Sequence, residues 1–207
     1  MDEPTRVKIC GITRVEDALL AAELRAFAVG FVFWPGSPRF IDPYRARAIA
    51  AALPPDVTTV GVFVDQPADY VNSVAGLVPL GVVQLHGSES IDDFEQVRCR
   101  LIRAVGLADD FDASSIDRMP SRVTVLLDAH DPIRRGGTGR TVDWAVAAGI
   151  ARRRRTILSG GLTADNVRAA VDVVRPYAID VSSGVESAPG VKDAAKLRAL
   201  FAALART

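Results

Sequence analysis

Short apolar runs alternate with helical patterns along almost the whole chain, and this alternation restricts the fold more than any other feature. Most runs are nearly continuous and rich in Val and Ile, as in strands that are covered on both faces. Strand–helix alternation implies right-handed crossover connections and a parallel sheet. Eight such runs are expected to be strands: residues 7–12, 27–34, 58–64, 81–86, 100–106, 122–128, 155–159 and 178–182.

Helices are expected between these strands. Thr13 and Glu16 have the spacing of a capping box, which predicts that the first helix begins at Thr13. The other helical patterns end in a C-terminal helix, and the full set is 13–25, 44–53, 69–77, 91–98, 112–119, 143–152, 164–174 and 192–205.

Eight strand–helix units in 207 residues match the lower size limit of the TIM (β/α)8 barrel. A doubly wound open sheet is the competing fold, but it carries a glycine fingerprint in its first turn. Here the first turn has only Gly11. We therefore expect residues 1–207 to form one α/β domain, a single (β/α)8 barrel with an eight-stranded parallel sheet.

The composition excludes several other classes of protein. The 25 basic residues balance 25 acidic ones, so no excess charge draws the chain to nucleic acid or to an anionic membrane. No apolar run reaches the ~18 residues of a membrane helix, and the N-terminus lacks the pattern of a signal peptide. Cys10 and Cys99 are too few for a disulfide scaffold and fit a reducing compartment. We expect a cytoplasmic protein with neither nucleic acid nor membrane as partner.

Polar residues gather where the predicted strands end, on the face where barrel enzymes build their active sites. Cys10, at the end of the first strand, can be either a small buried hydrophobic residue or a reactive thiol placed before a helix N-terminus, which favours the thiolate. Such clustering at one end of the strands favours an enzyme. The other strand ends carry Ser37 and Arg39, Asp65, Gln84 and His86, Asp128, Ser159 to Gly161, and Ser182 to Gly184.

Two of these strand ends predict a phosphate site. Gly160 and Gly161 follow the seventh strand, and Ser183 and Gly184 follow the eighth, the two loops on which barrels commonly seat a phosphate. Glycine lets the backbone approach an anion, and its N–H groups can point at the oxygens. The glycine-rich segment 131–139 is either a plain connection or a lid over the substrate.

A series of short motifs runs in order along nearly the whole chain: Lys8–Thr13, Ser37–Arg39, Val60–Asp65, Gln84–Gly87, Leu126–Asp128, Gly136–Gly139, Ser159–Leu162 and Asp180–Glu186. In these motifs the chain resembles the phosphoribosylanthranilate isomerase family of tryptophan biosynthesis. The resemblance implies an Amadori rearrangement of N-(5-phosphoribosyl)anthranilate to 1-(2-carboxyphenylamino)-1-deoxyribulose 5-phosphate. No step transfers electrons or needs a Lewis acid, so we expect no cofactor and no metal. The expected partner is a phosphorylated small-molecule substrate, and the expected assembly is a monomer or a homodimer.

The resemblance also implies roles for individual residues. Asp128 would be the acid that protonates the furanose ring oxygen, and Cys10 the base that removes the C2′ proton. Because an ordinary aspartate is almost wholly ionised at pH 7, Asp128 needs burial or a nearby anion to keep its proton. Arg39 would hold the anthranilate carboxylate, as a bidentate pair if the geometry allows. Substrate binding is further assigned to Gln84, His86 and Gly137.

Two alternatives stay open. The first is an isomerase of a related aminoaldose phosphate from the histidine pathway; a substrate with a phosphate at both ends should need a second phosphate loop, and no glycine-rich loop occurs among the first four strands. The second is a catalytically inactive barrel that binds a phosphorylated sugar as a sensor. Such a protein can keep Gly161 and Gly184 but has no reason to keep Cys10 and Asp128 together.

Strand alternation makes one further prediction, about Lys8. Side chains alternate along a strand, so Lys8 faces the same way as Cys10, and Asp180 faces the same way as Ser182. The first and eighth strands become neighbours when a barrel closes, so Lys8 should point into the barrel and pair with Asp180. The alternative is a register in which Lys8 faces the outer helices and reaches solvent.

Overall fold

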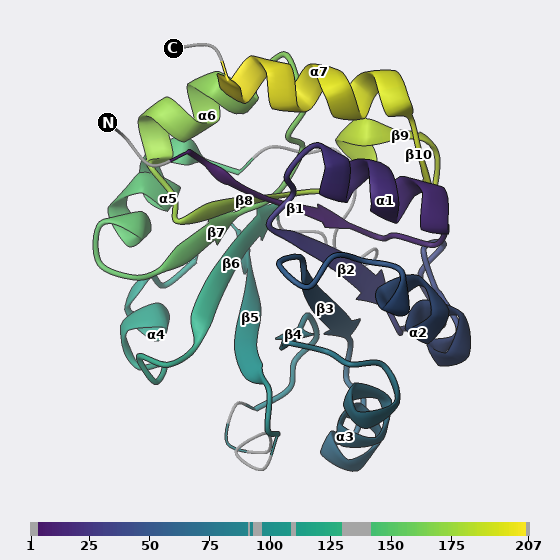
Figure 1. The fold of residues 1–207 in the computed structure, drawn as a ribbon. Helices are drawn as coiled ribbons and strands as arrows, with labels where there is room; N and C mark the ends of the chain where they lie inside the picture. The colour runs from purple at the N-terminus through teal and green to yellow at the C-terminus, as the bar shows by residue number, and fades with distance from the viewer. Residues whose placement is uncertain (1–3, 91, 93–96, 109–110, 130–141, 206–207) are drawn as a thin grey trace.

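Eight parallel strands close into a barrel in the order β1-β2-β3-β4-β5-β6-β7-β8, with helices around the outside (Figure 1). The computed structural model describes residues 4–90, 92, 97–108, 111–129 and 142–205. The predicted (β/α)8 barrel is confirmed, and each strand matches its predicted run to within about two residues. The strands are β1 Arg6–Cys10, β2 Ala28–Val32, β3 Thr58–Phe63, β4 Val82–Leu85, β5 Arg100–Leu107, β6 Thr124–Ala129, β7 Thr156–Leu158 and β8 Ala178–Val181.

The helices lie between the strands in sequence and cover the outer face of the sheet (Figure 1). They are α1 Val15–Glu23, α2 Pro43–Ala51, α3 Ala68–Leu77, α4 Ser114–Asp117, α5 Trp144–Ala151, α6 Val167–Val174 and α7 Ala194–Ala205. The helix expected at 91–98 falls mostly outside the described residues. In the part of the chain that the structure describes, no helix is both long and apolar enough to cross a bilayer.

Three helices begin at aspartate caps that the chain sequence supplies, and in α7 the Asp193 side chain accepts from the backbone N–H groups of Ala195 and Lys196. The side chain of Asp42 accepts hydrogen bonds from the backbone N–H groups of Tyr44 and Arg45, and Pro43 fills the first helical position. Asp143 caps α5 in the same way. These caps fix where each helix leaves the carboxyl end of the barrel.

The predicted capping box at Thr13 is wrong. Helix α1 begins at Val15 with Arg14 at its N-cap position, and no side chain caps it. The Thr13 hydroxyl instead donates to the carbonyl of Gly190, and the Arg14 guanidinium pairs with Asp17 at 2.6 Å. The Thr13 hydroxyl, which the local sequence pattern predicted to cap α1, is therefore bound by a segment distant in the sequence.

That distant segment is a small addition to the barrel that the sequence did not predict. After β8 the chain forms a 3-10 helix, η2 (Ser183–Val185), and then a two-stranded antiparallel hairpin of β9 (Glu186–Ala188) and β10 (Val191–Lys192). The hairpin lies beside the N-terminal end of α7 and above the loop that follows β1 (Figure 1). It brings two charged residues, Glu186 and Lys192, to the carboxyl end of the barrel.

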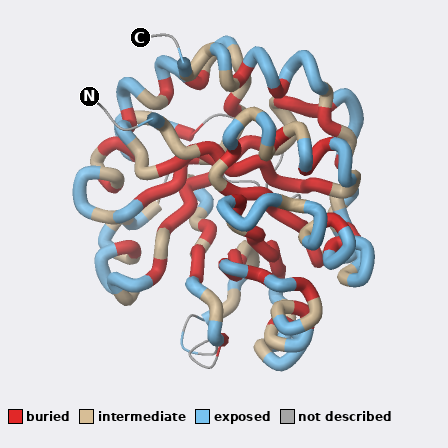
Figure 2. Tube along the Cα trace, viewed as in Figure 1, coloured by how far each residue is buried: buried red, intermediate tan, exposed pale blue. Residues whose placement is uncertain are grey.

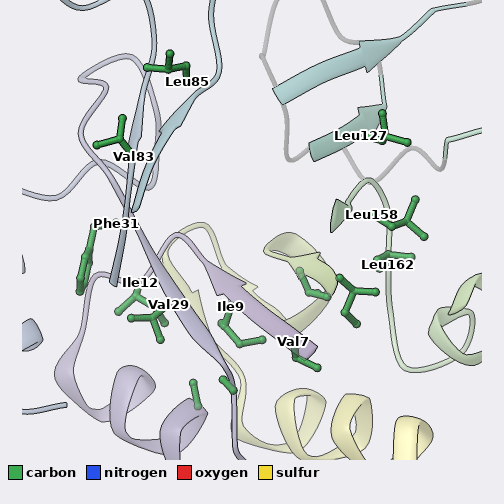
Figure 3. Close-up of a cluster of buried hydrophobic side chains, with 14 of the residues drawn as sticks. Val7, Ile9, Ile12, Val29, Phe31, Val83, Leu85, Leu127, Leu158 and Leu162 are labelled. Atoms are coloured by element: carbon green, nitrogen blue, oxygen red, sulfur yellow. The ribbon is translucent and has the colours of Figure 1, made fainter. Parts of the chain in front are cut away.

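The core has two separate layers because strand side chains alternate between the two faces of the sheet. One face packs against the helices and forms the main apolar cluster, part of which is drawn in Figure 3. The other face fills the barrel interior near the amino ends of the strands, with Val60, Ile102, Leu126 and Ile157 among its members. Figure 2 shows the strands buried and the outer surfaces of the helices exposed. The upper interior combines polar residues with a third, small cluster of Cys10, Val32 and Val62.

Candidate active site

A cavity of about 370 Å³ lies at the carboxyl ends of the strands. Every catalytic or substrate-binding candidate that the structure describes lines it, namely Cys10, Arg39, Gln84, His86 and Asp128. The remaining candidate, Gly137, lies outside the described residues. The structure therefore gathers residues from three strands, β1, β4 and β6, and from the segments that follow β2 and β4 around a single space.

Cys10 ends β1 and packs beside Val32 and Val62, with Trp34 against the same cluster. Its side chain is buried, with 8% exposure. Burial raises the pKa of the thiol, and the opposing effect of the Lys8 ammonium is too small to reverse this. The sequence argument expected a favoured thiolate. That expectation is wrong, because desolvation outweighs the neighbouring positive charge, and the resting residue is a thiol.

Lys8 points into the barrel, one layer below Cys10, and its Nζ lies 2.8 Å from Oδ1 of Asp180. The two strands pair in the register that puts Lys8 directly beside Asp180. Lys8 is fully buried and Asp180 is 6% exposed. Burial opposes a charge on Lys8, but attraction to Asp180 and Cys10 outweighs burial and raises the lysine pKa. The predicted inward ion pair is confirmed.

Asp128, at the end of β6, is also buried. Its Oδ1 accepts a hydrogen bond from the N–H of Ala129, and its Oδ2 lies 3.5 Å from Nε2 of His86. Nδ1 of His86 lies 3.0 Å from the side-chain nitrogen of Gln84. With that amide nitrogen as donor, Nδ1 is the acceptor and the ring proton sits on Nε2, facing Asp128.

Arg39 lies in the loop between β2 and α2 and reaches the cavity from the side. Its backbone N–H donates to the Ser37 hydroxyl at 3.1 Å, which shapes the turn. Its guanidinium pairs with Glu186, with 2.7 Å between Nη2 and Oε2. The structure thus places Arg39 at the cavity as predicted, and it adds a carboxylate partner that no sequence argument supplied.

The predicted phosphate residues are brought side by side. Gly160 and Gly161 follow β7 with φ angles of +87° and +60°, which strongly favour glycine. A Cβ on Gly184 would lie 1.9 Å from the carbonyl oxygen of Leu162, so the loops after β7 and β8 meet at a contact that only glycine allows. Ser159 and Ser182, one residue before each predicted pair, line the cavity.

Two buried side-chain atoms of the cavity have no hydrogen-bond partner in the described part of the chain. They are Oε1 of Gln84 and the hydroxyl of Ser182. Buried polar atoms are normally satisfied, so each marks a position where a bound molecule can supply the missing partner. A sugar hydroxyl has the right chemistry for both.

Sequence reasoning missed part of this site. Val32, Val62 and Trp34 form an apolar wall, and only the short sequence distance from Trp34 to Arg39 hinted at it. Glu186 was visible as the last residue of a motif, but without a role. Nothing in the sequence pointed to Lys192, because only the β9–β10 hairpin brings it to the site.

A closed barrel that holds a buried cysteine and a buried aspartate side chain around one cavity at its carboxyl end defines a class, the acid–base enzymes of the (β/α)8 fold. Comparison with known proteins narrows the class. Residues 7–203 match the family model described as N-(5′-phosphoribosyl)anthranilate (PRA) isomerase. The chain belongs to this family, whose members are aldose–ketose isomerases of tryptophan biosynthesis.

Individual relatives agree with the family assignment. N-(5′-phosphoribosyl)anthranilate isomerase of Pelobacter propionicus is 50% identical over 195 residues, which cover 93% of this chain and 92% of the relative. The crystal structure of the Thermus thermophilus enzyme is 46% identical, with a TM-score of 0.88 over 97% of this chain and 98% of that one. A PRA isomerase in complex with reduced 1-(o-carboxyphenylamino)-1-deoxyribulose 5-phosphate is 43% identical, with a TM-score of 0.86 and the same coverage.

Proposed function

We propose that this chain converts N-(5-phosphoribosyl)anthranilate into 1-(2-carboxyphenylamino)-1-deoxyribulose 5-phosphate, with Asp128 as acid and Cys10 as base. The observation that carries the proposal is that both residues line one cavity from non-adjacent strands, β6 and β1. A sugar bound between them meets a proton donor on one side and a proton acceptor on the other. Family membership supports the same reaction.

The chemistry divides into two proton transfers. Asp128 gives a proton to the furanose ring oxygen, the bond from that oxygen to C1′ breaks, and the nitrogen lone pair forms an iminium. Cys10 then removes the C2′ proton, and those electrons neutralise the iminium to give an enolamine, which tautomerises to the ketone. Both steps need correctly protonated groups within hydrogen-bond reach of the sugar.

The protonation states of the acid and the base are linked. The reactive form carries one proton on Asp128 and none on Cys10, so the pair as a whole holds one proton. Because burial raises the pKa of Cys10, this form is a minor one at neutral pH. A thiolate formed in such a site is a stronger base than an ordinary one, which offsets part of its scarcity.

The other polar residues of the cavity then bind the substrate. Arg39 holds the anthranilate carboxylate, and Gln84 and His86 contact the sugar, with His86 also orienting Asp128. The backbone of Gly160, Gly161, Ser183 and Gly184 holds the 5′-phosphate, supported by the contact between the two loops. Gly137 is part of the same proposal on the strength of its motif.

We further propose that residues 1–207 act as one catalytic domain in the cytoplasm. The two free cysteines, Cys10 and Cys99, fit a reducing compartment. The partner that this proposal requires is the phosphorylated substrate itself.

The test is turnover of freshly made phosphoribosylanthranilate, followed by loss of its fluorescence. Cys10→Ser and Asp128→Asn should each lower kcat by at least about 100-fold, the usual contribution of an acid or base. Cys99→Ser is the matched control, because that thiol donates a hydrogen bond to the carbonyl of Leu80 and does not line the cavity, and it should keep full activity. Near wild-type kcat in either cavity variant would remove its assigned role.

The same assay separates the alternatives. Turnover of a histidine-pathway aminoaldose phosphate in place of phosphoribosylanthranilate would establish the related isomerase. Binding of phosphorylated sugars without any turnover, in folded protein, would establish the sensor.

A further inference from the structure

The side chain of Arg39 is constrained before any substrate reaches it. Its Nε and Nη2 atoms both donate to the carboxylate of Glu186, at 3.0 Å from Nε to Oε1 and 2.7 Å from Nη2 to Oε2. This is the paired geometry in which a planar guanidinium matches a carboxylate, and it fixes the plane of the guanidinium as well as its position.

The stem of Arg39 is constrained as well, by Gly11. Gly11 has a φ angle of +74°, and a Cβ built on it would lie 2.6 Å from Cδ and 3.3 Å from Cβ of Arg39. The arginine side chain therefore crosses directly over the backbone that follows Cys10. A residue with a side chain at position 11 would displace it.

Glu186 is itself held by the hairpin that carries it. Its Oε1 accepts hydrogen bonds from Nζ of Lys192 at 2.8 Å and from the N–H of Gly190 at 3.2 Å. Lys192 Nζ also donates to the carbonyl oxygens of Cys10 and Ser182. Lys192 is 3% exposed and Glu186 is 7% exposed. Because water can hardly solvate either charge, both groups depend on these hydrogen-bond partners.

These contacts leave one edge of Arg39 available. A guanidinium has five N–H donors, and Glu186 uses the edge formed by Nε and Nη2. The edge formed by Nη1 and the second hydrogen of Nη2 has no partner in the described part of the chain. That edge has the spacing of a carboxylate, and Arg39 lines the cavity.

The charges of this cluster are unbalanced. Arg39 and Lys192 carry two positive charges, and Glu186 carries one negative charge, so the cluster has a net charge of about +1 in a buried site. Burial lowers the pKa of Lys192, and the attraction to Glu186 opposes this effect. A single carboxylate from a bound molecule completes it.

We infer that Glu186, held by Lys192, is a positioning residue that aims the open edge of Arg39 at the carboxylate of the substrate. This inference rests on the proposed function and deepens it, because it assigns the preference for a carboxyl-bearing aromatic amine to a residue that touches no substrate. Glu186 acts through Arg39 alone, since its own oxygens are occupied by Arg39, Lys192 and Gly190.

The test compares two substrates, phosphoribosylanthranilate and the phosphoribosyl adduct of aniline, which lacks the carboxylate. Glu186→Gln keeps an acceptor but loses the charge and one of the paired contacts. It should lower the ratio of kcat/KM for phosphoribosylanthranilate to kcat/KM for the aniline adduct by about tenfold or more. The change should come mainly from a higher KM for phosphoribosylanthranilate, as expected when hydrogen bonds to a charged group are weakened. In an Arg39→Ala background the same substitution should narrow the preference no further.

Two features keep the outcome interpretable. Because Glu186→Gln leaves Lys192 buried without its anion, the double variant Glu186→Gln/Lys192→Met is measured as well, and thermal unfolding checks that both fold. If folded Glu186 variants keep the wild-type preference, or if the losses in the Arg39→Ala background simply add, the positioning role is wrong. Wild-type protein that fails to turn over phosphoribosylanthranilate would instead defeat the proposed function.

Discussion

Removing the Lys8 ammonium should destabilise the protein more than any other single loss of charge in the barrel interior. Lys8 Nζ lies 2.8 Å from Asp180 Oδ1, with Lys8 fully buried and Asp180 6% exposed. Lys8→Met keeps an unbranched side chain of similar length and leaves Asp180 without its counter-charge. The perturbation therefore isolates the electrostatic part of the pair.

The expected size follows from this geometry. Breaking a buried ion pair by removing one partner costs about 3–5 kcal/mol, because the other charge is left buried and uncompensated. For a chain of this length, each kcal/mol shifts the midpoint of thermal unfolding by about 2–4 °C, so the midpoint should fall by roughly 6–20 °C. Lys8→Met/Asp180→Asn removes both charges and should recover most of the loss, because paired replacement of buried ions is often nearly neutral.

The difference in unfolding free energy between wild type and Lys8→Met should depend on pH, in a direction set by the pKa shift of Lys8. The Lys8 pKa is raised above its ordinary value, so the folded state holds the proton more tightly than the unfolded state. The contribution of Lys8 to stability is therefore complete at pH values below its pKa in the unfolded state. It is lost as the pH rises through its pKa in the folded state. In urea unfolding, the gap between wild type and Lys8→Met should stay constant from about pH 6 to 9 and narrow only above about pH 10.4.

Two results would refute this reasoning. One is a Lys8→Met variant within about 1 kcal/mol of wild type at pH 7, which would mean that the pair contributes no more than an exposed one. The other is a double variant as unstable as the sum of the single variants, which would mean that the two residues are not coupled.

Three further measurements probe the rest of the site. Gly184→Ala should lower the free energy of unfolding by at least about 1–3 kcal/mol, because its Cβ would lie 1.9 Å from the Leu162 carbonyl oxygen. Gly76→Ala in α3, where nothing lies within 4 Å of the new Cβ, should raise it by about 0.5–1 kcal/mol. Equal effects of the two substitutions in urea unfolding would contradict this. Inorganic sulfate should compete with substrate and bind near Gly161 and Gly184 in a soaked crystal, and sulfate found only elsewhere would count against the phosphate site. Because burial raises the pKa of Cys10, the alkaline limb of kcat/KM should lie above about pH 8.5, and a limb below that value would be inconsistent with a buried base.

Much of this protein could be predicted from local patterns alone. Apolar runs of strand length separated by helical patterns specify a parallel barrel, since few other arrangements bury eight such strands. Alternation along β1 and β8 then put Lys8, Cys10 and Asp180 on the inner face, and the structure confirms the Lys8–Asp180 pair. These inferences succeeded because they depend only on the period of a strand and on the closure of the barrel.

The tertiary structure alone decided how the charged groups of the site share their partners. Arg39 and Glu186 are 147 positions apart, and the hairpin that joins them, with Lys192, follows no local pattern strong enough to predict. The same hairpin took the Thr13 hydroxyl from the expected helix cap. The pKa of Cys10 was misjudged for a related reason, because desolvation depends on what packs around a thiol in space and outweighed the charges near it.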